Sequence, residues 1–177
     1  MQYITTYPSI LGELTLACDG ECLTGLWLSD QKYFMANVSE VIEKPDLPVL
    51  QDARAWLDCY FQGKDPGAIP AVKPQGTEFR QRVWKLLAQI PYGNVTTYGQ
   101  LAKTIAADQG VEKMSSRAVG GAVGHNPISI IVPCHRVIGA NGSLTGFGGG
   151  IARKIQLLEL EGIDVSKYSI PTKGTAL

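Results

Sequence analysis

The stretch TYGQLAKTIAADQGVEKMSSRAVGGAV, residues 97–123, contains the start signals of two short helices. Thr97 and Gln100 form a capping-box pattern, in which each side chain binds the other residue's backbone N–H, so a helix is predicted directly after Thr97. Ser115 or Ser116 can cap a second helix. Two short helices joined by a turn predict a helix-turn-helix, although the connector here is longer than the usual few residues.

Helical patterns continue on both sides of this pair. Thr77 is the predicted N-cap of an earlier helix, which Pro91 is expected to end. Its apolar side chains recur at helical spacing, at Phe79, Val83, Leu86, Leu87 and Ile90. A last helix is predicted from about Ile151 to Glu161, with Gly162 as its stop signal. The second part of the chain is therefore expected to be mostly helical.

The opening of the chain alternates apolar and polar residues, as strands do. A two-residue type I′ turn at Asp19-Gly20 is predicted to close a hairpin in which Leu16 faces Leu23. A helix with one apolar stripe is predicted near residues 50–61. The first part of the chain is thus expected to combine an antiparallel sheet with a helix.

Residues 64–76 hold three prolines and two glycines, which predicts a linker between domains at 1–75 and 76–177. The whole chain has no net charge, but residues 1–76 carry −5 and residues 77–177 carry +5. This asymmetry favours contact of the second half with a polyanion, although solvated charged faces can give similar sums.

Composition narrows the class of protein further. No apolar run reaches the roughly 20 residues that span a bilayer, and the first residues lack the regions of a signal peptide, so we expect a cytoplasmic protein, or a nuclear one in a eukaryote, without a membrane partner. Four scattered cysteines predict free thiols: Cys18, Cys22, Cys59 and Cys134. Cys18 and Cys22 have the spacing of half a zinc site, but no further ligand is evident, so no metal is predicted.

The run Pro133-Cys134-His135-Arg136 is the sharpest chemical feature. Thiolate is the nucleophilic form of cysteine, and a neighbouring imidazole and guanidinium are expected to lower the pKa of Cys134. The β-branched run at 128–132 predicts a strand, and Pro133 predicts a bend after it, because adjacent strand residues would face opposite sides. The alternative is a structural buried cysteine at the end of a strand.

Two further residues break local rules. Glu161 lies in the last turn of its helix, where a carboxylate opposes the helix dipole, so we expect a specific partner, His135; a solvated surface glutamate is the alternative. The pair Gly120-Gly121 costs a helix about 2 kcal/mol relative to alanine. It allows close approach of another backbone, either that of DNA or that of a neighbouring helix.

Together these segments resemble the O6-alkylguanine-DNA alkyltransferases. The resemblance covers residues 77–162 through several ordered motifs, at 77–84, 90–93, 97–102, 117–120, 126–127 and 131–139, while the first half matches mainly in layout. It implies an α+β protein, with an N-terminal α/β (ribonuclease-H-like) domain built on an antiparallel sheet and a C-terminal winged-helix-like helical domain.

The resemblance also implies roles for individual residues. Cys134 would accept the alkyl group. His135 would remove the thiol proton through water, and Glu161 would hold that histidine. Asn126 would brace the turn, and Tyr98 would donate a proton to the leaving guanine and help to rotate the nucleotide.

The lesion pocket and the DNA surface are implied in the same way. The Val137 carbonyl would read the guanine amino group, the Gly148 N–H would meet the guanine oxygen, and Phe147 would line the pocket. Arg117 would enter the duplex as a finger. The implied DNA-binding set is Thr97, Tyr98, Ser116, Arg117, Ala118, Gly120, Gly121 and Arg136.

The activity implied is DNA repair: one irreversible transfer per molecule from the O6 of guanine, and from the O4 of thymine, after nucleotide flipping. A monomer without a cofactor would bind double-stranded DNA through the minor groove. The chain departs from the pattern at residues 107–116, which look longer than usual, and its glycine-rich residues 146–150 are expected to admit groups larger than methyl. The alternatives are a non-catalytic sensor of alkylation damage, a helix-turn-helix regulator and a cysteine hydrolase.

Overall fold

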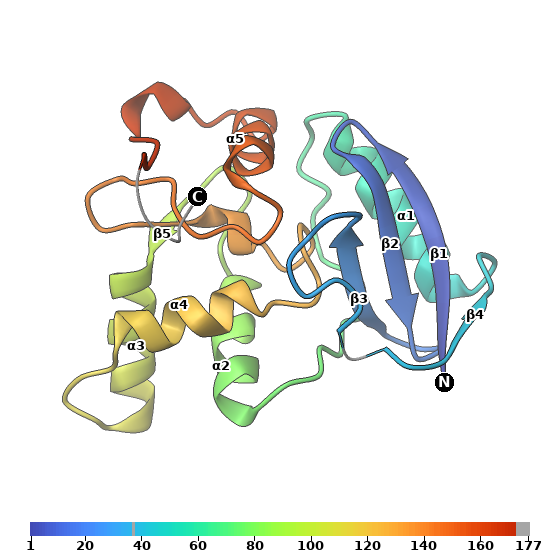
Figure 1. The fold of residues 1–177 in the computed structure, drawn as a ribbon, viewed down its shortest axis with the longest axis horizontal. Helices are drawn as coiled ribbons and strands as arrows, with labels where there is room; N and C mark the ends of the chain where they lie inside the picture. The colour runs from blue at the N-terminus through green and yellow to red at the C-terminus, as the bar shows by residue number, and fades with distance from the viewer. Residues whose placement is uncertain (37, 173–177) are drawn as a thin grey trace. The chain divides into compact units, whose positions relative to one another are not determined.

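The computed structural model describes residues 1–36 and 38–172 of the chain. The chain forms two compact units (Figure 1). Of the described residues, the first unit comprises 1–36, 38–75 and 127–131, and the second comprises 76–126 and 132–172. The short segment 127–131 thus belongs to the first unit, although its neighbours on both sides belong to the second.

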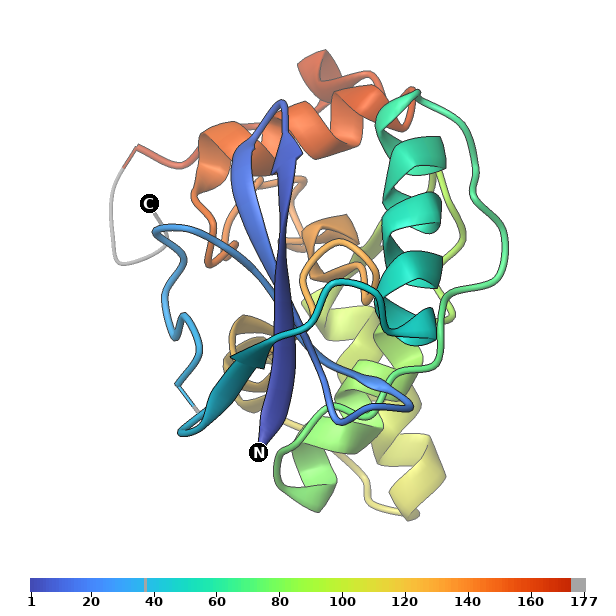
Figure 2. The same cartoon turned by 90° about the vertical axis from the view of Figure 1, so that its right-hand side faces the viewer.

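The first unit is a four-stranded sheet with one long helix. The strands follow the order β3 (Leu23–Leu28), β2 (Gly12–Cys18), β1 (Gln2–Ser9), β4 (Val41–Glu43). β1, β2 and β3 pair antiparallel, as predicted, whereas the short edge strand β4 runs parallel to β1. The helix α1 (Pro48–Phe61) lies along the sheet (Figure 2), to which it is tied by the Tyr7–Asp58 hydrogen bond of 2.6 Å.

The hairpin between β2 and β3 differs from the predicted one. The loop is residues 19–22, and Leu16 pairs with Leu26 instead of Leu23. The reason lies in the Asp19 carboxylate, which accepts backbone hydrogen bonds of 3.1 and 2.9 Å from the last two loop residues. A side chain that binds the loop backbone in this way favours a longer turn than type I′. Leu16 and Leu23 are both buried, as expected.

The proline-rich segment 64–76 is anchored to the first unit instead of crossing open solvent. The Leu23 N–H donates to the carbonyl of Ala71 (2.8 Å), and the Lys73 N–H donates back to Leu23 (2.7 Å). These bonds satisfy polar groups at the outer edge of β3.

The strand predicted at 128–132 is not formed. Ile128 makes one isolated bridge to Leu26, and Ile130 has a φ of 70°, which a strand excludes. The segment instead folds into a turn whose Ser129 hydroxyl donates to the Gln31 side chain (2.9 Å). The β-branched residues predicted a strand, but hydrogen bonds to other residues of the first unit hold this segment as a turn.

The second unit is mainly helical. Its helices are α2 (Glu78–Leu87), α3 (Tyr98–Gln109), α4 (Ser116–Gly124) and α5 (Ile151–Leu160), with the 3₁₀ turns η1 (Cys134–Arg136) and η2 (Val165–Lys167). The strands β5 (Thr96–Thr97) and β6 (Val137–Ile138) form a small parallel sheet.

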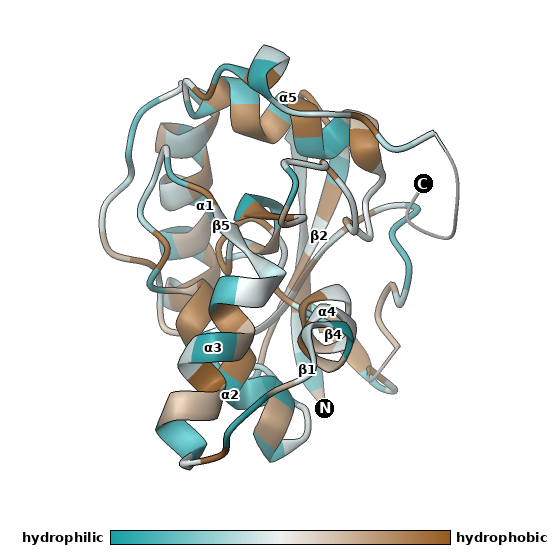
Figure 3. Cartoon of the chain, turned by 90° about the vertical axis from the view of Figure 1, so that its left-hand side faces the viewer, coloured by the Kyte–Doolittle hydropathy of each residue, from teal (hydrophilic) through white to brown (hydrophobic). Residues whose placement is uncertain are grey.

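The helix starts agree with the sequence. Thr77 caps α2, Thr97 and Gln100 form the predicted capping box of α3, and Ser115 caps α4. The helices α2, α3 and α4 pack against one another. Figure 3 shows hydrophobic and hydrophilic residues on both α2 and α3, as expected for helices that bury one face. The Trp84 indole N–H donates to the Ala122 carbonyl (2.8 Å), which joins α2 to α4. Among the described residues, no helix has both the length and the apolar character needed to cross a membrane.

Candidate active site

Cys134 begins the tight turn η1, which follows Pro133 and leads into β6. The predicted bend after Pro133 is therefore confirmed. Cys134 and His135 are both buried, and the Cys134 N–H donates to the Val132 carbonyl (2.8 Å). A 3₁₀ turn rotates successive side chains by about a third of a turn, so the two side chains need not face opposite sides as they would in a strand.

The Glu161 carboxylate, just after α5, accepts hydrogen bonds at both of its oxygens. Its Oε1 accepts from His135 Nε2 (2.6 Å) and from Arg136 Nη2 (3.0 Å). Its Oε2 accepts from Arg136 Nε (2.8 Å) and from the Gly93 N–H (3.1 Å). The expected partnership of Glu161 with His135 is confirmed, and Arg136 adds a bidentate ion pair that the sequence did not predict.

This arrangement fixes the protonation of the group. Burial alone raises the pKa of Glu161, but the hydrogen bonds and charges of His135 and Arg136 outweigh it and bring that pKa to about 2. Burial lowers the pKa of His135 despite the opposing influence of Glu161. Because the ionised carboxylate accepts from Nε2, Nδ1 becomes the basic nitrogen of the neutral ring.

The expectation of a lowered Cys134 pKa is wrong for this state of the protein. Burial raises the pKa of the Cys134 thiol, and the hydrogen bond from Asn126 and the charge of Lys154 oppose that rise only in part. The Arg136 charge, which was expected to help, is matched by Glu161. Cys134 at rest is therefore a thiol, and a base must remove its proton before it can react as a nucleophile. Asn126 Nδ2 also donates to the Val132 carbonyl (2.8 Å), which braces the turn.

Lys154 is a site residue that the sequence did not reveal. Its side chain on α5 is fully buried, and its ammonium donates to the carbonyls of Val137 and, at 2.7 Å, Thr145. The Val137 carbonyl has a second lone pair that can still accept from another donor. A buried lysine is uncommon, and a position four residues into an ordinary helix gave no signal of it.

The Tyr98 hydroxyl lies beside the glycine-rich loop, which comprises residues 139–150. It donates to the carbonyls of Thr145 (3.1 Å) and Gly146 (3.3 Å). Gly146 has a φ of 82°, and a Cβ there would lie 2.3 Å from the Tyr98 oxygen, so only glycine fits. Phe147 is buried with its ring centroid 6.5 Å from that of His135, and Gly148 is half-buried. Phe147 therefore lies beside the cysteine turn, and the charge of Cys134 acts on Tyr98.

The implied DNA-binding residues fall into two groups. Ser116, Arg117, Ala118 and Gly121 on α4 are exposed, and a Cβ on Gly121 would meet no atom within 4 Å, so no contact inside the chain requires that glycine. Gly120 lies near the Tyr98 ring, and Thr97 is half-buried as a helix cap.

Arg136 does not belong to that exposed surface. It is only 6% exposed, and its guanidinium is bound by Glu161 and by the Ile90 carbonyl (2.6 Å). The prediction of a DNA contact is corrected for this reason: the guanidinium donors point into the protein. A charged residue next to the acceptor cysteine predicted an exposed contact because its partner lies far away in the sequence.

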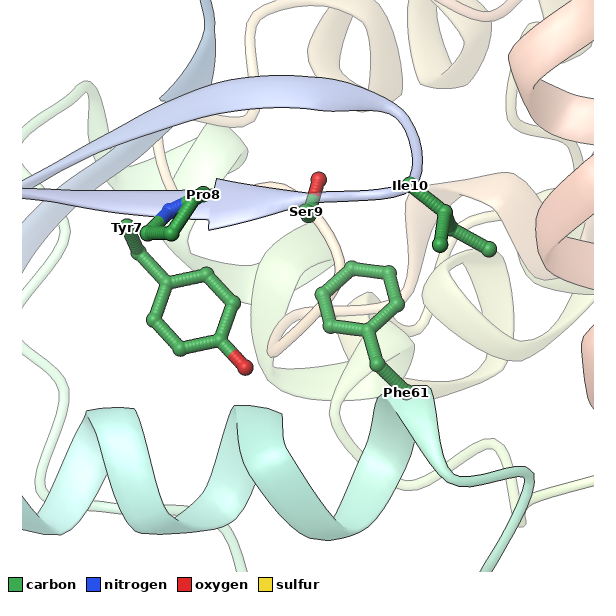
Figure 4. A pocket seen from close by; sticks show the side chains of 5 residues that line it. All are labelled: Tyr7, Pro8, Ser9, Ile10 and Phe61. Carbon is green, nitrogen blue, oxygen red and sulfur yellow. The ribbon is translucent and has the colours of Figure 1, made fainter.

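The first unit also has a hollow of about 360 Å³, lined by Tyr7, Pro8, Ser9, Ile10 and Phe61 (Figure 4). The Tyr7 and Phe61 rings stack at 6.1 Å, and the Tyr7 hydroxyl is bound by Asp58. The Ser9 hydroxyl donates to Gly12 (2.6 Å). The lining of this hollow is mainly apolar, and the hydroxyls of Tyr7 and Ser9 are both hydrogen-bonded, so the hollow offers no acid–base pair for catalysis.

The second unit thus combines a pair of short helices, of which α4 exposes one side, with a buried cysteine whose neighbouring histidine is held by a carboxylate. This combination is typical of a DNA-binding protein that carries a reactive cysteine. A family model for the DNA binding domain of 6-O-methylguanine DNA methyltransferase matches residues 78–163, and one for the ribonuclease-like domain of the same family matches residues 2–67. The chain belongs to this family, as its sequence motifs predicted.

Several relatives support this assignment. A methylated-DNA–protein-cysteine methyltransferase of Haemophilus influenzae is 45% identical over 163 residues, which cover 91% of this chain and 87% of the relative. The protein chain in the crystal structure of Mycobacterium tuberculosis OGT in complex with DNA is 43% identical in sequence to this chain, with a TM-score of 0.78 over 94% of both chains. The structure of an O6-methylguanine DNA methyltransferase from Methanococcus jannaschii is 26% identical, with a TM-score of 0.61 over 97% of this chain and 99% of that one.

Proposed function

We propose that this protein repairs DNA by transferring a methyl or larger alkyl group from the O6 of guanine to Sγ of Cys134. The observation that carries the proposal is the buried Cys134 turn with its Glu161-held histidine, in a chain of this family. Membership of the family and the DNA complex of the Mycobacterium tuberculosis relative support DNA as the partner.

The reaction is a displacement at the alkyl carbon. His135, acting through water, takes the thiol proton, because its Nδ1 is the basic nitrogen of a buried neutral ring. The thiolate then attacks: a C–S bond forms, the bond between carbon and O6 breaks, and guanine leaves with the electron pair. Tyr98 supplies a proton to the guanine. The thioether is stable, so each molecule reacts once.

The target carbon lies on a base edge inside the stack, so the nucleotide must be flipped out at a cost of a few kcal/mol. Arg117 is exposed near the start of α4 and fills the gap in the duplex, which offsets part of that cost. The small residues Ala118 and Gly121 let the helix approach the sugar–phosphate backbone closely from the minor groove.

The remaining parts of the proposal concern range and setting. O4-alkylthymine presents the same alkyl–oxygen bond at a base edge and is a second substrate. The protein acts as a monomer, without a cofactor, in the cytoplasm, or in the nucleus of a eukaryote. The glycine-rich loop accommodates alkyl groups larger than methyl, and equal transfer rates for methyl and benzyl lesions would support this, whereas strict preference for methyl would contradict it.

The experiment mixes protein with an excess of duplex containing O6-methylguanine and measures restored guanine by nucleoside chromatography. We expect one guanine per protein molecule from the wild type and none from Cys134→Ser. Lesion binding without restoration would identify a damage sensor instead. Several guanines restored per molecule would contradict the single-turnover mechanism.

A further inference from the structure

Lys154 is a buried cation that the reaction described above does not use. Its side chain is fully buried in the first turn of α5, where the helix dipole also disfavours a positive charge. Its two hydrogen-bond acceptors, the carbonyls of Val137 and Thr145, are uncharged. Within residues 1–36 and 38–172, no ion pair joins Lys154 to a carboxylate. A buried ammonium in this position is costly unless an anion lies nearby.

The helix α5, which carries Lys154, packs against the cysteine turn η1, so Cys134 is the group beside this ammonium that becomes an anion when its proton is removed. The Arg136 charge is matched by Glu161, and the His135 ring is neutral. Burial, and then the charge of Cys134, raise the pKa of Tyr98, so its side chain is a neutral phenol before the transfer. Burial lowers the pKa of Lys154 to about 8, and a negative charge on Cys134 opposes that effect. The Lys154 charge in turn favours the Cys134 thiolate.

We propose that Lys154 is the counter-ion of the Cys134 thiolate and holds the lesion pocket in shape around it, an inference that rests on the proposed alkyl transfer. The ammonium stabilises the negative charge that appears once His135 has taken the proton. It touches neither the lesion nor the alkyl carbon, so it is a positioning residue.

The second part of this role follows from the shared acceptors of Lys154. The Thr145 carbonyl accepts from the Lys154 ammonium (2.7 Å) and from the Tyr98 hydroxyl (3.1 Å). The Val137 carbonyl belongs to β6, which follows the cysteine turn directly. One side chain therefore connects α5, β6 and the glycine-rich loop, and it fixes the acceptor that orients Tyr98.

The test measures the thiolate directly, without DNA. Iodoacetamide alkylation of the Cys134 peptide is followed by mass spectrometry as a function of pH in Lys154→Gln, which keeps an amide donor but loses the charge. An opposite charge within ion-pair range lowers a pKa by about 1–3 units. We therefore expect Lys154→Gln to react roughly ten- to a thousandfold more slowly at neutral pH, with its profile moved to higher pH.

Three further variants make the result decisive. Lys154→Arg keeps the charge and should retain a reactivity close to that of the wild type, and Lys167→Met removes an exposed lysine in η2 and should change nothing. Lys154→Met is the second neutral variant, because an apolar isostere of a buried charge often folds well. A folded neutral variant with the wild-type profile would overturn the proposal, as would the failure of both neutral variants to fold.

Transfer from an O6-methylguanine duplex is measured in parallel. Loss of transfer in Lys154→Gln with rescue by Lys154→Arg is the expected result. Failure of the wild type to transfer methyl would contradict the proposed function, whereas the iodoacetamide profile would still report on the pairing of Lys154 with Cys134.

Discussion

Replacing Glu161 by glutamine removes one charge and one acceptor from the centre of the site. The carboxylate accepts from His135 Nε2 and Arg136 Nη2 at Oε1, and from Arg136 Nε and the Gly93 N–H at Oε2. An amide offers one oxygen and one NH₂ group. Whichever way it is turned, its NH₂ group faces two donors.

The magnitude follows from those contacts. Two buried donors without acceptors cost about 1–3 kcal/mol each, and removal of one partner of a buried ion pair costs about 3–5 kcal/mol in all. We expect Glu161→Gln to lower the free energy of unfolding at neutral pH by about 3–5 kcal/mol. Transfer should slow by at least about a hundredfold, because general-base catalysis contributes roughly that much and His135 loses its orientation.

The same substitution should change the dependence of stability on pH. The folded pKa of Glu161 is about 2, below its ordinary value of 4.5. The carboxylate therefore contributes fully above pH 4.5, and its contribution of roughly 3 kcal/mol is lost as the pH falls towards 2. Glu161→Gln should lack this loss.

Urea denaturation at several pH values measures both effects, with single-turnover transfer assays beside it. Glu159→Gln is the matched control, because Glu159 is exposed on the same helix. The reasoning is refuted if Glu161→Gln unfolds within about 0.5 kcal/mol of the wild type, the range expected of a surface change. It is also refuted if the variant keeps the wild-type acid dependence.

Four further outcomes are expected. Burial lowers the pKa of His135 in the folded protein below its ordinary 6.5, so the unfolded chain binds more protons at mildly acidic pH. The free energy of unfolding of the wild type should therefore begin to fall as the pH drops below about 6.5, which denaturation curves between neutral and mildly acidic pH test. Asn126→Ala should lose about 1–3 kcal/mol in urea and react more slowly with iodoacetamide at Cys134. Arg117→Ala should keep its stability within about 0.5 kcal/mol and its reactivity with free O6-methylguanine base, but it should lose transfer from duplex DNA. Equal loss with both substrates would contradict the role of Arg117 in the DNA duplex. Tyr98→Phe should slow transfer by roughly a hundredfold or more while losing only about 1 kcal/mol in a thermal melt, so an unchanged rate would remove its assigned proton transfer.

The parts of the fold that were predictable depend on local chemistry. The capping box of Thr97 and Gln100 and the Ser115 cap involve residues three positions apart, so the sequence contains the whole interaction. Glu161 was identified because a carboxylate at a helix C-terminus is locally unfavourable and needs a partner, which proved to be His135.

The errors arose where distant residues decide the outcome. Arg136 is buried by its bonds to Glu161 and to the Ile90 carbonyl, and nothing beside it in the sequence indicates this. The sequence around Lys154 is that of an ordinary surface lysine on a helix, but in the structure its side chain is buried and binds carbonyls of β6 and of the glycine-rich loop. The turn at 127–131 replaced a strand because its hydrogen-bond partners lie in the first unit.

The central claim is that Cys134 itself receives the alkyl group, and peptide mass spectrometry tests it most directly. The protein is incubated with a duplex carrying O6-methylguanine whose methyl group is labelled with deuterium, and each of the four cysteine peptides is examined. We predict one labelled methyl group per molecule, on the Cys134 peptide, and none in Cys134→Ser. A label on Cys18, Cys22 or Cys59, or an unlabelled protein that still binds the lesion, would contradict the account.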